Sequence, residues 1–396
     1  MTNQPPAWDA QILDRIGQGD LAGLTWLELE STSADDPLGG EQAWVFEGLA
    51  DIERVLHRAE IGHEDLVEEP IAWAVAMAYQ DDDQVRRIVV LDGPAGEPAS
   101  VIAWVSVWMP MTANLSNASV FVGVDPRWRR RGLGEVLLQA GEALAQAEGR
   151  TVLQAATFIP GATGPTTAPD GTPWPTMRPK SGVGEAPITP SVKWVLAHGY
   201  EMEQVDRQST LNLPVDPELL DRLSAEAEMR ADGYRLHTWR TQVPDEWAGQ
   251  FAALLQAMID APSAGLDFEE EPWDVDRLRR EEAECADEGM DQLHTVAEHI
   301  ATGELAAFTT IQWNVPPIDQ LREFAFQEDT LVARTHRGHR LGMLVKVANL
   351  RAFAEVHPGA KRLHTWNAEE NAHMLAINVA LGFVPNGGDA SYQRRV

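Results

Sequence analysis

Cysteine, lysine and tyrosine are scarce in this chain of 396 residues. The single cysteine, Cys285, has no partner for an internal disulfide and excludes a cysteine-based metal cluster. No run of about 18 apolar residues occurs, so no membrane-spanning helix is expected. The opening segment MTNQPPAWDA lacks the basic and then apolar pattern of a secretory signal. Together these absences predict a cytoplasmic protein.

Positive charge is also in short supply. The chain has 31 lysine and arginine residues against 61 aspartate and glutamate residues, which gives a net charge of −30 at pH 7. Binding to nucleic acid or to an anionic membrane requires a basic surface, so neither is expected as a partner. Solubility is one explanation of the excess of acid, and attraction of a cationic amine substrate is another.

Against this background, one stretch concentrates positive charge. Residues 120–139 read VFVGVDPRWRRRGLGEVLLQ, in which four arginines and a Gly-x-Gly stand between a valine-rich strand and a helix. The start of a helix presents backbone N–H groups without intrahelical acceptors and about half a unit of positive charge. Glycine allows a ligand to approach the backbone, and arginine pairs with phosphate oxygens. The stretch therefore predicts a seat for an anion such as a pyrophosphate.

The same pattern occurs twice in the chain. Residues 124–145 align with residues 332–354 when Arg129 is placed over Arg337, and residues 192–204 align with residues 376–388. A repeat of about 200 residues is too long for a solenoid and indicates two tandem copies of one domain. The first copy carries an additional segment, residues 159–190, which is rich in Pro, Gly and Thr and is predicted to be a long loop.

The repeat divides the chain into four parts. We expect an N-terminal arm (1–23) with a helix over 7–16, a first domain (24–213), a linker helix (214–233) and a second domain (234–396). Each domain reads as strand, helix, several strands, motif strand, motif helix, strand, helix and final strands. Antiparallel pairs are expected for 85–93 with 100–109 and for 293–301 with 305–313. This order predicts an α/β fold of α+β type, a mixed sheet with helices on its faces.

The two motifs resemble a known family. The string V-D-P-x-x-R-R-R-G-L-G resembles the acyl-CoA signature of the GNAT N-acetyltransferase superfamily, Arg/Gln-x-x-Gly-x-Gly/Ala, with Arg129, Gly132 and Gly134 at its fixed positions. In the second copy Arg337 and Gly342 fill the pattern, Arg340 replaces the middle glycine, and Gly338 stands two residues earlier. The string NAEENAHMLAINVALGF resembles a second family signature at Asn371, Gly382 and Phe383.

The resemblance implies two tandem GNAT-like acyl-CoA N-acyltransferase domains that cover the chain from about residue 24. It implies direct transfer of acetyl from acetyl-CoA to a primary amine of a small molecule, without a metal. The residues that it implies for CoA binding are Val124, Arg129, Arg130, Arg131, Gly132 and Gly134 in the first copy, and Val332, Arg334, Arg337, Gly338, His339, Arg340, Gly342 and Asn371 in the second.

The two copies differ where the family has its chemistry. Asp329 stands three residues before Val332, where the family often has a base that takes the proton of the amine, whereas Phe121 occupies the aligned position of the first copy. Asn371 aligns with Ile188. We therefore expect a catalytic C-terminal domain and a degenerate N-terminal domain that binds CoA or shapes the substrate site. The alternative for Asp329 is a structural residue at a strand end.

The proton donor to the leaving thiolate is less well specified. The family's tyrosine aligns with Asn378 in the second copy and with Val195 in the first, and neither donates a proton usefully. Of the four tyrosines, Tyr392 on the last strand is the candidate; water and His373 are alternatives.

A non-catalytic CoA-binding sensor is the competing functional class. A Rossmann or P-loop nucleotide site is disfavoured because neither motif has a following ribose-binding acid or a Gly-Lys-Ser/Thr. The acidic stretch 265–274, GLDFEEEPWD, reads either as a cation site or as a solvated loop.

Overall fold

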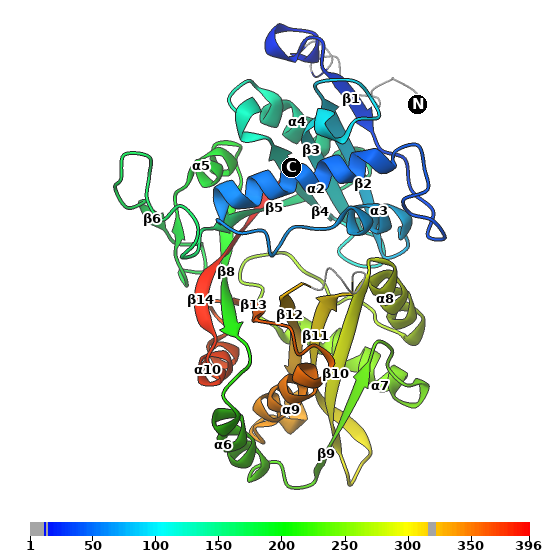
Figure 1. Cartoon of the computed structure of the whole chain (residues 1–396), viewed down its shortest axis with the longest axis vertical. Coiled ribbons are helices and arrows are strands. Elements are labelled where there is room, and N and C mark those ends of the chain that lie inside the picture. The colour runs from blue at the N-terminus through cyan, green and yellow to red at the C-terminus, as the bar shows by residue number, and fades with distance from the viewer. Residues whose placement is uncertain (1–11, 13–14, 316–321) are drawn as a thin grey trace. The chain divides into compact units, whose positions relative to one another are not determined.

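A computed structural model describes residues 12, 15–315 and 322–396 of the chain (Figure 1). The predicted helix 7–16 lies mostly outside these residues. The chain forms two compact units. Unit 1 comprises residues 1–205, 264–269 and 389–396, and unit 2 comprises residues 206–263 and 270–388. Each unit is described by itself below. None of the described helices combines the length and the apolar character that crossing a lipid bilayer would require.

Unit 1 is a mixed sheet covered by helices on both faces. Its elements are β1 (Thr25–Glu28), α2 (Ala43–Glu60), α3 (Pro70–Ala78), β2 (Asp83–Leu91), β3 (Val101–Pro110), β4 (Asn117–Val124), α4 (Leu133–Ala147), β5 (Val152–Ile159), β6 (Thr176–Met177), β7 (Ala186–Pro187), α5 (Pro190–Ala197) and the start of β8 (Glu201–Asn212). Strands β1 to β4 pair antiparallel in order, and β4 and β5 pair parallel. The expected antiparallel pair of the first copy is therefore confirmed.

Two apolar cores lie on the two faces of this sheet. Helices α2 and α3 pack through Phe46, Leu49 and Trp73 onto one face of β2 and β3, and α2 crosses the strands in Figure 1. Helices α4 and α5 pack through Leu137 and Val192 onto the other face. Both cores follow from strands whose two faces are apolar, as expected for a sheet covered on both sides.

Unit 2 repeats this arrangement. Its elements are α6 (Pro217–Glu228), β9 (Tyr234–Arg240), α7 (Asp245–Gln256), α8 (Val275–Asp287), β10 (Met290–His299), β11 (Glu304–Asn314), β12 (Phe324–Val332), α9 (Leu341–Val356), β13 (Arg362–Ala368), α10 (Ala372–Leu381) and the start of β14 (Val384–Arg395). Strands β9 to β12 pair antiparallel in order, β12 and β13 pair parallel, and β13 pairs antiparallel with the end of β8. The expected pair of β10 and β11 is confirmed.

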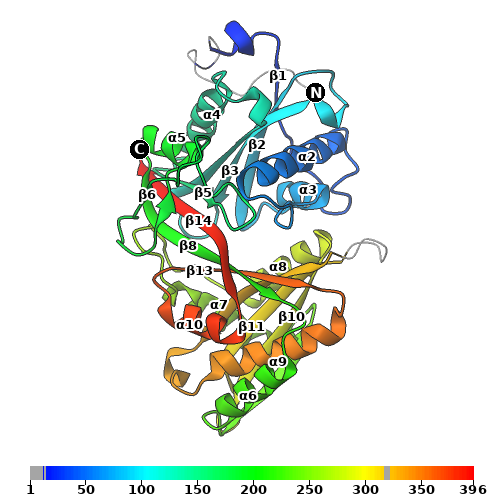
Figure 2. The same ribbon diagram turned by 60° about the vertical axis from the view of Figure 1, so that its left-hand side comes forward.

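The helix expected as a linker is part of the core of unit 2. Helix α6 begins after Asp216, whose side chain caps it by accepting from the N–H of Glu218 at 3.0 Å. Leu220 and Leu223 then pack with residues of α9, and the two helices lie side by side in Figure 2. Helices α7 and α8 cover the opposite face of the sheet through Phe251 and Leu278. Unit 2 therefore begins within β8, before this helix.

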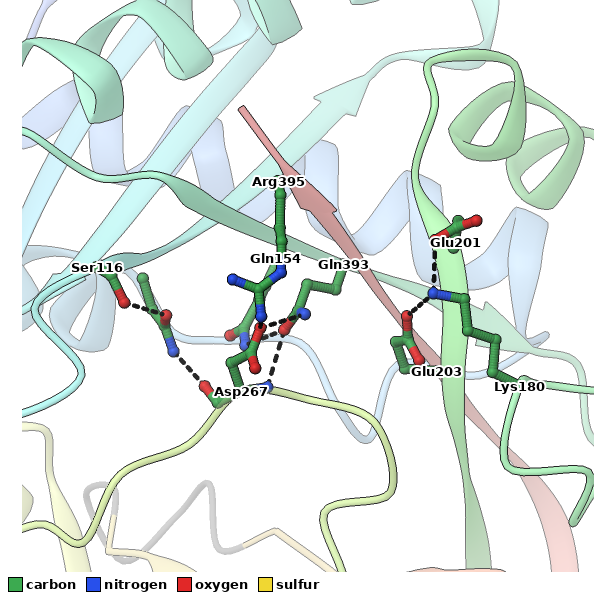
Figure 3. A network of polar contacts seen from close by, with 9 residues as sticks. Ser116, Gln154, Lys180, Glu201, Glu203, Asp267, Gln393 and Arg395 are labelled. Atoms are coloured by element: carbon green, nitrogen blue, oxygen red, sulfur yellow. Dashed lines mark hydrogen bonds and ion pairs between the residues drawn. The ribbon is translucent and has the colours of Figure 1, made fainter.

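Two segments of unit 1 come from distant parts of the chain. Residues 389–396, the end of β14, bury Ala390 and Tyr392 completely in the core around α4 and α5. Residues 264–269 are held by Asp267, whose carboxylate accepts from Gln393 at 2.6 Å and from Arg395 (Figure 3). The expected second domain, 234–396, thus differs from unit 2 by these two segments and by residues 206–233, which unit 2 includes. Sequence periodicity does not reveal the difference because neither segment is a complete element.

The insertion of the first copy has structure of its own. Residues 159–190 contain the two-stranded ribbon of β6 and β7, and Thr163 donates to the carbonyl oxygen of Ile61 at the end of α2, at 3.0 Å. Lys180 forms ion pairs with Glu201 and Glu203 on β8 at 2.5 and 2.7 Å (Figure 3). The segment is therefore a loop that is fastened at both ends to unit 1.

Candidate functional site

In each unit the two parallel central strands separate after a short paired stretch. Strands β4 and β5 pair from Asn117 to Ser119, and β12 and β13 pair from Phe324 to Phe326. The remaining residues of β4 and β12 lead directly into the arginine-rich turns. Each separation exposes backbone groups of the motif strand, which is where the family resemblance implies that the pantetheine chain of CoA pairs.

The two turns have the same backbone, although their glycines stand at different positions. Arg130 and Gly132 have positive φ angles of 62° and 90° in the first turn, and Gly338 and Arg340 have φ angles of 89° and 57° at the aligned positions of the second. Left-handed backbone favours glycine, so each turn carries one glycine where it is required and one arginine under strain. Arg340 therefore replaces the middle glycine of the signature without a change in the shape of the turn.

The turns meet the requirements of a pyrophosphate seat. No described residue accepts a hydrogen bond from the backbone N–H groups of residues 130–135 or of residues 338–343. A Cβ atom built on Gly132 or on Gly338 would meet nothing within 4 Å, so the space beside each turn is open. Free N–H donors at a helix start next to open space are what a phosphate group binds. The residues of both turns therefore fit CoA, which these N–H groups would hold.

Most of the cationic side chains of the turns have partners within the protein. Arg129 and Arg337 occupy the same role, since their Nε atoms donate to the carbonyl oxygens of Val124 and Val332 at 3.1 and 3.3 Å. Each of these hydrogen bonds fixes the backbone at the end of the motif strand. The first arginine of the signature therefore binds the protein backbone.

Other members of the set are engaged as well. Arg129 pairs with Glu60 at 2.6 Å, Arg131 stacks on Trp128 and donates to the carbonyl oxygen of Arg127, Arg340 pairs with Glu226 at 2.9 Å, and Arg334 has partners too. His339 contacts the carbonyl oxygen of Arg230 at 3.1 Å. Arg130 differs from all of these, because its exposed side chain makes no hydrogen bond, ion pair or ring contact with a described residue. It is the arginine best placed to meet a phosphate.

The last glycine of each signature serves packing. A Cβ atom on Gly134 would lie 3.5 Å from Trp194 of α5 and 3.8 Å from Val124. On Gly342 it would lie 3.2 Å from Ile377 of α10 and 3.6 Å from Val332. These glycines allow the motif helix to pack closely against the motif strand and the following helix.

A β-bulge in unit 2 brings two carboxylates onto one face of the sheet. Gln327 pairs with Ile311 and Thr330 pairs with Thr309, so two residues of β12 stand opposite the single residue Thr310 of β11. The side chains of Gln327 and Thr330 both contact Thr309 Oγ1, at 3.0 and 2.7 Å, and therefore share a face. The two residues between them, Glu328 and Asp329, consequently both point to the opposite face, which α7 and α8 cover.

The sequence analysis identified Asp329 and missed Glu328. Strict alternation along a strand would place the two acids on opposite faces, and only the bulge brings them together. Unit 1 has no bulge at this point, because β3 and β4 pair without a shift from Ala103 to Trp108. The adjacent pair of acids in a motif strand was the signal that could have pointed to Glu328.

Both carboxylates are open to solvent yet have perturbed acidity. Their side chains are exposed. The protein around the Glu328 carboxylate nevertheless takes away part of its hydration, and this desolvation, together with the charge of Asp329, raises the pKa of Glu328 to about 7. Desolvation also raises the pKa of Asp329. A carboxylate that is accessible and holds its proton up to neutral pH is suited to exchange protons with a ligand.

Asn371 has a structural role in this arrangement. Its Oδ1 accepts from the N–H of Met374 at 3.2 Å and caps α10. Asn378, at the position of the family's tyrosine, is buried and donates to Oδ1 of Asn367 at 2.6 Å. The side chain of Asn371 thus caps the start of α10, and this contact gives no support to the prediction that Asn371 takes part in chemistry.

Tyr392 and Asp329 belong to different units of the chain. Tyr392 belongs to unit 1, is fully buried and makes a hydrogen bond of 3.0 Å with Thr157 of β5. Burial raises its pKa to about 12. The role of Tyr392 as the acid of the second copy therefore has no support from its contacts, which lie in the core of unit 1.

The acidic stretch 265–274 is bound to its neighbours. Glu269 accepts from the N–H of Asn114 at 3.1 Å, Glu270 accepts from Gln256, and Glu271 pairs with Arg277 at 2.9 Å. With Asp267 held as shown in Figure 3, each of these acids has a partner inside its own part of the protein. These contacts favour the interpretation as a loop over that as a cation site.

The described residues contain no set of three or more His, Cys, Asp and Glu side chains that is arranged to hold a metal ion. The histidines of the second turn pack around an aromatic ring instead. His336 makes a hydrogen bond of 2.9 Å with the hydroxyl of Tyr234, and His339 lies with its ring centroid 5.4 Å from that of Tyr234.

Comparison with known proteins agrees with this geometry. Residues 49–162 match the model of the Acetyltransferase (GNAT) family. None of the curated proteins compared with the chain matches it. The match covers α2 to β5, which includes the first turn and the strands that form its site.

Solved structures extend the likeness to the whole chain. A tandem GNAT protein from the clavulanic acid biosynthesis pathway superimposes with a TM-score of 0.67 and 23% identity, over 94% of this chain and 98% of that one. A GCN5-related N-acetyltransferase from Sphaerobacter thermophilus superimposes with a TM-score of 0.52 and 14% identity, over 93% and 95%. The fold is thus that of the GNAT acetyltransferase superfamily. The chain thus has the fold of a tandem GNAT protein, and the two copies of one domain that its repeat predicted are confirmed by this likeness.

Proposed function

We propose that unit 2 transfers the acetyl group of acetyl-CoA to a primary amine of a small molecule. The observation that carries this proposal is the bulge in β12, which presents Glu328 and Asp329 on one face of the strand that leads into the CoA-type turn. An alkyl amine is mostly an ammonium ion near pH 7 and must lose a proton before it can attack. An exposed carboxylate with a pKa of about 7 is suited to take that proton.

Acetyl-CoA supplies the acyl group as a thioester. The N–H groups of the second turn would hold its pyrophosphate, and Glu328 would accept a proton from the ammonium group. The freed amine attacks the thioester carbonyl, the C–N bond forms and the C–S bond breaks. The nitrogen then loses its surplus proton, and the thiolate leaves and takes up a proton, so the two transfers balance. Thiolate is a fair leaving group, so a water molecule is sufficient as the donor and no tyrosine is required.

A CoA-binding sensor without catalysis is the second candidate. It is favoured by Asn378, which stands where the family has its tyrosine and whose side chain is committed to Asn367. A sensor would bind CoA through the two turns and release no thiol.

Release of free CoA thiol from acetyl-CoA, measured with a panel of primary amines, decides between the two. We expect amine-dependent release by the wild-type protein and a loss of at least 100-fold in the double variant Glu328→Gln/Asp329→Asn. Glu323→Gln is the matched control, because Glu323 directly precedes β12 and pairs with Lys361 on the surface. CoA binding without thiol release from any amine would instead support the sensor.

A further inference from the structure

A cluster of three histidines surrounds the ring of Tyr234 at the second turn of unit 2. His336 and His339 belong to the turn itself, and His299 is the last residue of β10. The ring centroids of His299, His336 and His339 lie 5.2, 5.7 and 5.4 Å from that of Tyr234. His339 is exposed, and the other two histidines are half-buried. The function proposed above gives these three side chains no role.

Two of the three rings carry the hydrogen of the neutral imidazole on Nδ1. Nδ1 of His339 donates to the carbonyl oxygen of Arg230 at 3.1 Å, because a carbonyl oxygen only accepts. Nδ1 of His299 lies 2.9 Å from Oγ1 of Thr302. The hydroxyl hydrogen of Thr302 is donated to Glu304 at 3.0 Å, so the hydroxyl oxygen accepts from His299. Each of these rings is therefore held at Nδ1, and its Nε2 is bare while the ring is neutral.

The third ring is held by a bond that fits both of its protonation states. Nδ1 of His336 lies 2.9 Å from the hydroxyl oxygen of Tyr234. The hydroxyl donates to Nδ1 of a neutral ring and accepts from Nδ1 of a protonated one. Desolvation raises the pKa of Tyr234, so the hydroxyl keeps its hydrogen at neutral pH. None of the three rings therefore has to give up this internal bond in order to take up a proton.

The Nε2 atoms are the sides of the rings that remain available. None of the three makes a hydrogen bond or an ion pair with any residue in the described part of the chain. Each Nε2 becomes an N–H donor when its ring is protonated. Three rings that are fixed at Nδ1 and available at Nε2 are suited to bind an anion with uptake of protons.

The charge of His336 is set by the groups around it. These are His299 of β10, Glu304 of β11 and, in its own turn, Arg334, Arg337 and His339. Desolvation lowers the pKa of His336, the charges of His299 and His339 lower it further, and the charge of Glu304 opposes the change. His336 is therefore neutral at pH 7 without a ligand. An anion bound beside it would raise its pKa and draw a proton onto the ring.

The chemistry of CoA offers an anion of the right kind close to this turn. The free N–H groups of residues 338–343 fit the pyrophosphate, and the ribose joined to that pyrophosphate carries a further phosphate at its 3′ position. This phosphate is a monoester with a second pKa of about 6 and a charge of about −1.5 to −2 at pH 7. It therefore matches protonated imidazoles better than the pyrophosphate does. The first turn has Trp128 and Arg131 at the positions of His336 and His339, so it lacks donors that titrate near pH 7.

We propose that His299, His336 and His339 form a site in unit 2 for the 3′-phosphate of CoA, and that this site takes up protons as the ligand binds. The protonated Nε2 atoms donate to the phosphate oxygens, while the bonds at Nδ1 hold the rings. The proposal rests on the second turn holding CoA, as proposed above, and not on transfer of the acetyl group. Unit 2 then distinguishes CoA from dephospho-CoA. Its affinity for CoA decreases as the pH rises from about 6.5 to 8, because the histidines lose their protons.

The test is calorimetric titration of the full chain with CoA and with dephospho-CoA near pH 6.5. The background Gly132→Asp removes binding by the first turn, because open space surrounds Gly132, aspartate tolerates positive φ, and its carboxylate repels phosphate. In this background we expect CoA to bind roughly 10-fold more tightly than dephospho-CoA. Replacement of the three histidines by glutamine should abolish the difference and leave the affinity for dephospho-CoA unchanged.

His237→Gln is the matched control. His237 lies three residues after Tyr234 and therefore on the opposite face of β9, where it bonds to Glu298 at 2.7 Å. This variant should keep the preference for CoA. Titration in buffers of different ionisation enthalpy should show uptake of about one proton with CoA and none with dephospho-CoA.

A measurement on the wild-type chain does not depend on the background variant. The Hε1 NMR signals of the three histidines, assigned from single glutamine variants, should titrate at higher pH with CoA than with dephospho-CoA. Equal titration with the two ligands would overturn the proposal. So would inorganic phosphate that shifts these signals while CoA and dephospho-CoA bind alike, because the site would then take free phosphate.

The outcomes also separate this proposal from that of acetyl transfer. Equal affinity of unit 2 for CoA and dephospho-CoA overturns the phosphate site alone, and thiol release still decides the reaction. Preference for CoA without thiol release from any amine overturns the reaction alone. Binding of neither ligand by the Gly132→Asp variant, when the wild type binds both, would overturn the two together.

Discussion

At the scale of single residues, the most informative pair is Glu328 and Asp329. They are neighbours in sequence and, because of the bulge, also neighbours on one face, so the charge of Asp329 contributes to the raised pKa of Glu328. A proton acceptor works only in its ionised form. For Glu328 this form predominates above pH about 7, so kcat/KM should fall as the pH decreases through that value.

The first prediction separates the two acids by the pH dependence of thiol release. Asp329→Asn removes the negative charge beside Glu328, lowers the pKa of Glu328 and should move the acidic limb of kcat/KM to lower pH. Glu328→Gln should remove the limb and lower kcat by roughly 10²- to 10⁴-fold. The reverse result, with the limb lost in Asp329→Asn and kept in Glu328→Gln, would make Asp329 the base, as the sequence suggested.

A second prediction concerns a lysine that the proposed chemistry does not use. Lys346 of α9 is 1% exposed, and burial lowers its pKa from 10.5 to about 7. Between these two values the unfolded chain binds more protons than the folded one, so stability should increase as the pH rises from about 7 toward 10.5. Lys346→Met should remove this slope and raise the free energy of unfolding near pH 7 by roughly 1–4 kcal/mol.

Urea unfolding monitored by circular dichroism at several pH values measures both effects. Lys361→Met is the control, because Lys361 is an exposed lysine paired with Glu323 and should keep the slope of the wild type. An equal slope in wild type and Lys346→Met would mean that the ammonium group of Lys346 is charged and solvated in the folded protein.

At the scale of elements, the two turns show that two different sequences can adopt the same backbone conformation. The first turn places glycine at its second left-handed position and the second turn places it at its first, while an arginine accepts the other position in each. The strain of an arginine with positive φ costs about 1–2 kcal/mol. The free N–H groups depend on the backbone alone, so both sequences can build the same anion seat.

The third prediction follows from Arg340. Arg340→Gly should stabilise the chain by about 1 kcal/mol, because glycine adopts its φ of 57° without strain and the lost pair with Glu226 is exposed. Arg340→Val should destabilise it by more than 1 kcal/mol and weaken CoA binding, since a β-branched residue disfavours this conformation. Arg340→Asn, which tolerates positive φ, should resemble the wild type in urea unfolding and in calorimetric CoA titration. Equal stability of the glycine and valine variants would show that the turn relaxes.

The elements were largely predictable from sequence, whereas the site was predictable only in part. Alternating and apolar runs located β9, β10, β11 and β13 to within a few residues, because local periodicity determines where strands lie. The roles of Arg129 and Asn371 were not predictable, since a signature records which residue is present and not whether its side chain binds ligand, backbone or helix end. Predicting the role of Glu328 would have required knowledge of the bulge, which depends on a register shift between two strands.

At the scale of the whole molecule, the division of the chain into units does not follow its repeat. The fourth prediction tests this with removal of residues 389–396. Unit 1 would lose the buried Tyr392, its bond to Thr157 and the ion pair of Arg394 with Glu142 at 2.6 Å. Hydrogen exchange should then accelerate by at least 10-fold in β5 and α4, while β10 and β11 of unit 2 keep their protection.

Tyr392→Phe in the full chain is the matched control, because it removes one hydrogen bond and leaves the strand in place. Its effect on exchange should be confined to β5 and smaller than that of the truncation. Equal acceleration in both units after truncation would mean that the two fold as one cooperative body.

The return of the last strand has a consequence for the order in which the protein is made. A ribosome synthesises the residues of β1 to β5 before those of unit 2, yet residues 389–396, which complete unit 1, are synthesised after unit 2. Domains generally fold as their sequence emerges. Here the core of unit 1 around Thr157 stays incomplete until unit 2 has been translated. Unit 2 has all of its own residues at that moment, so the unit whose synthesis starts first would be the second to complete its folding.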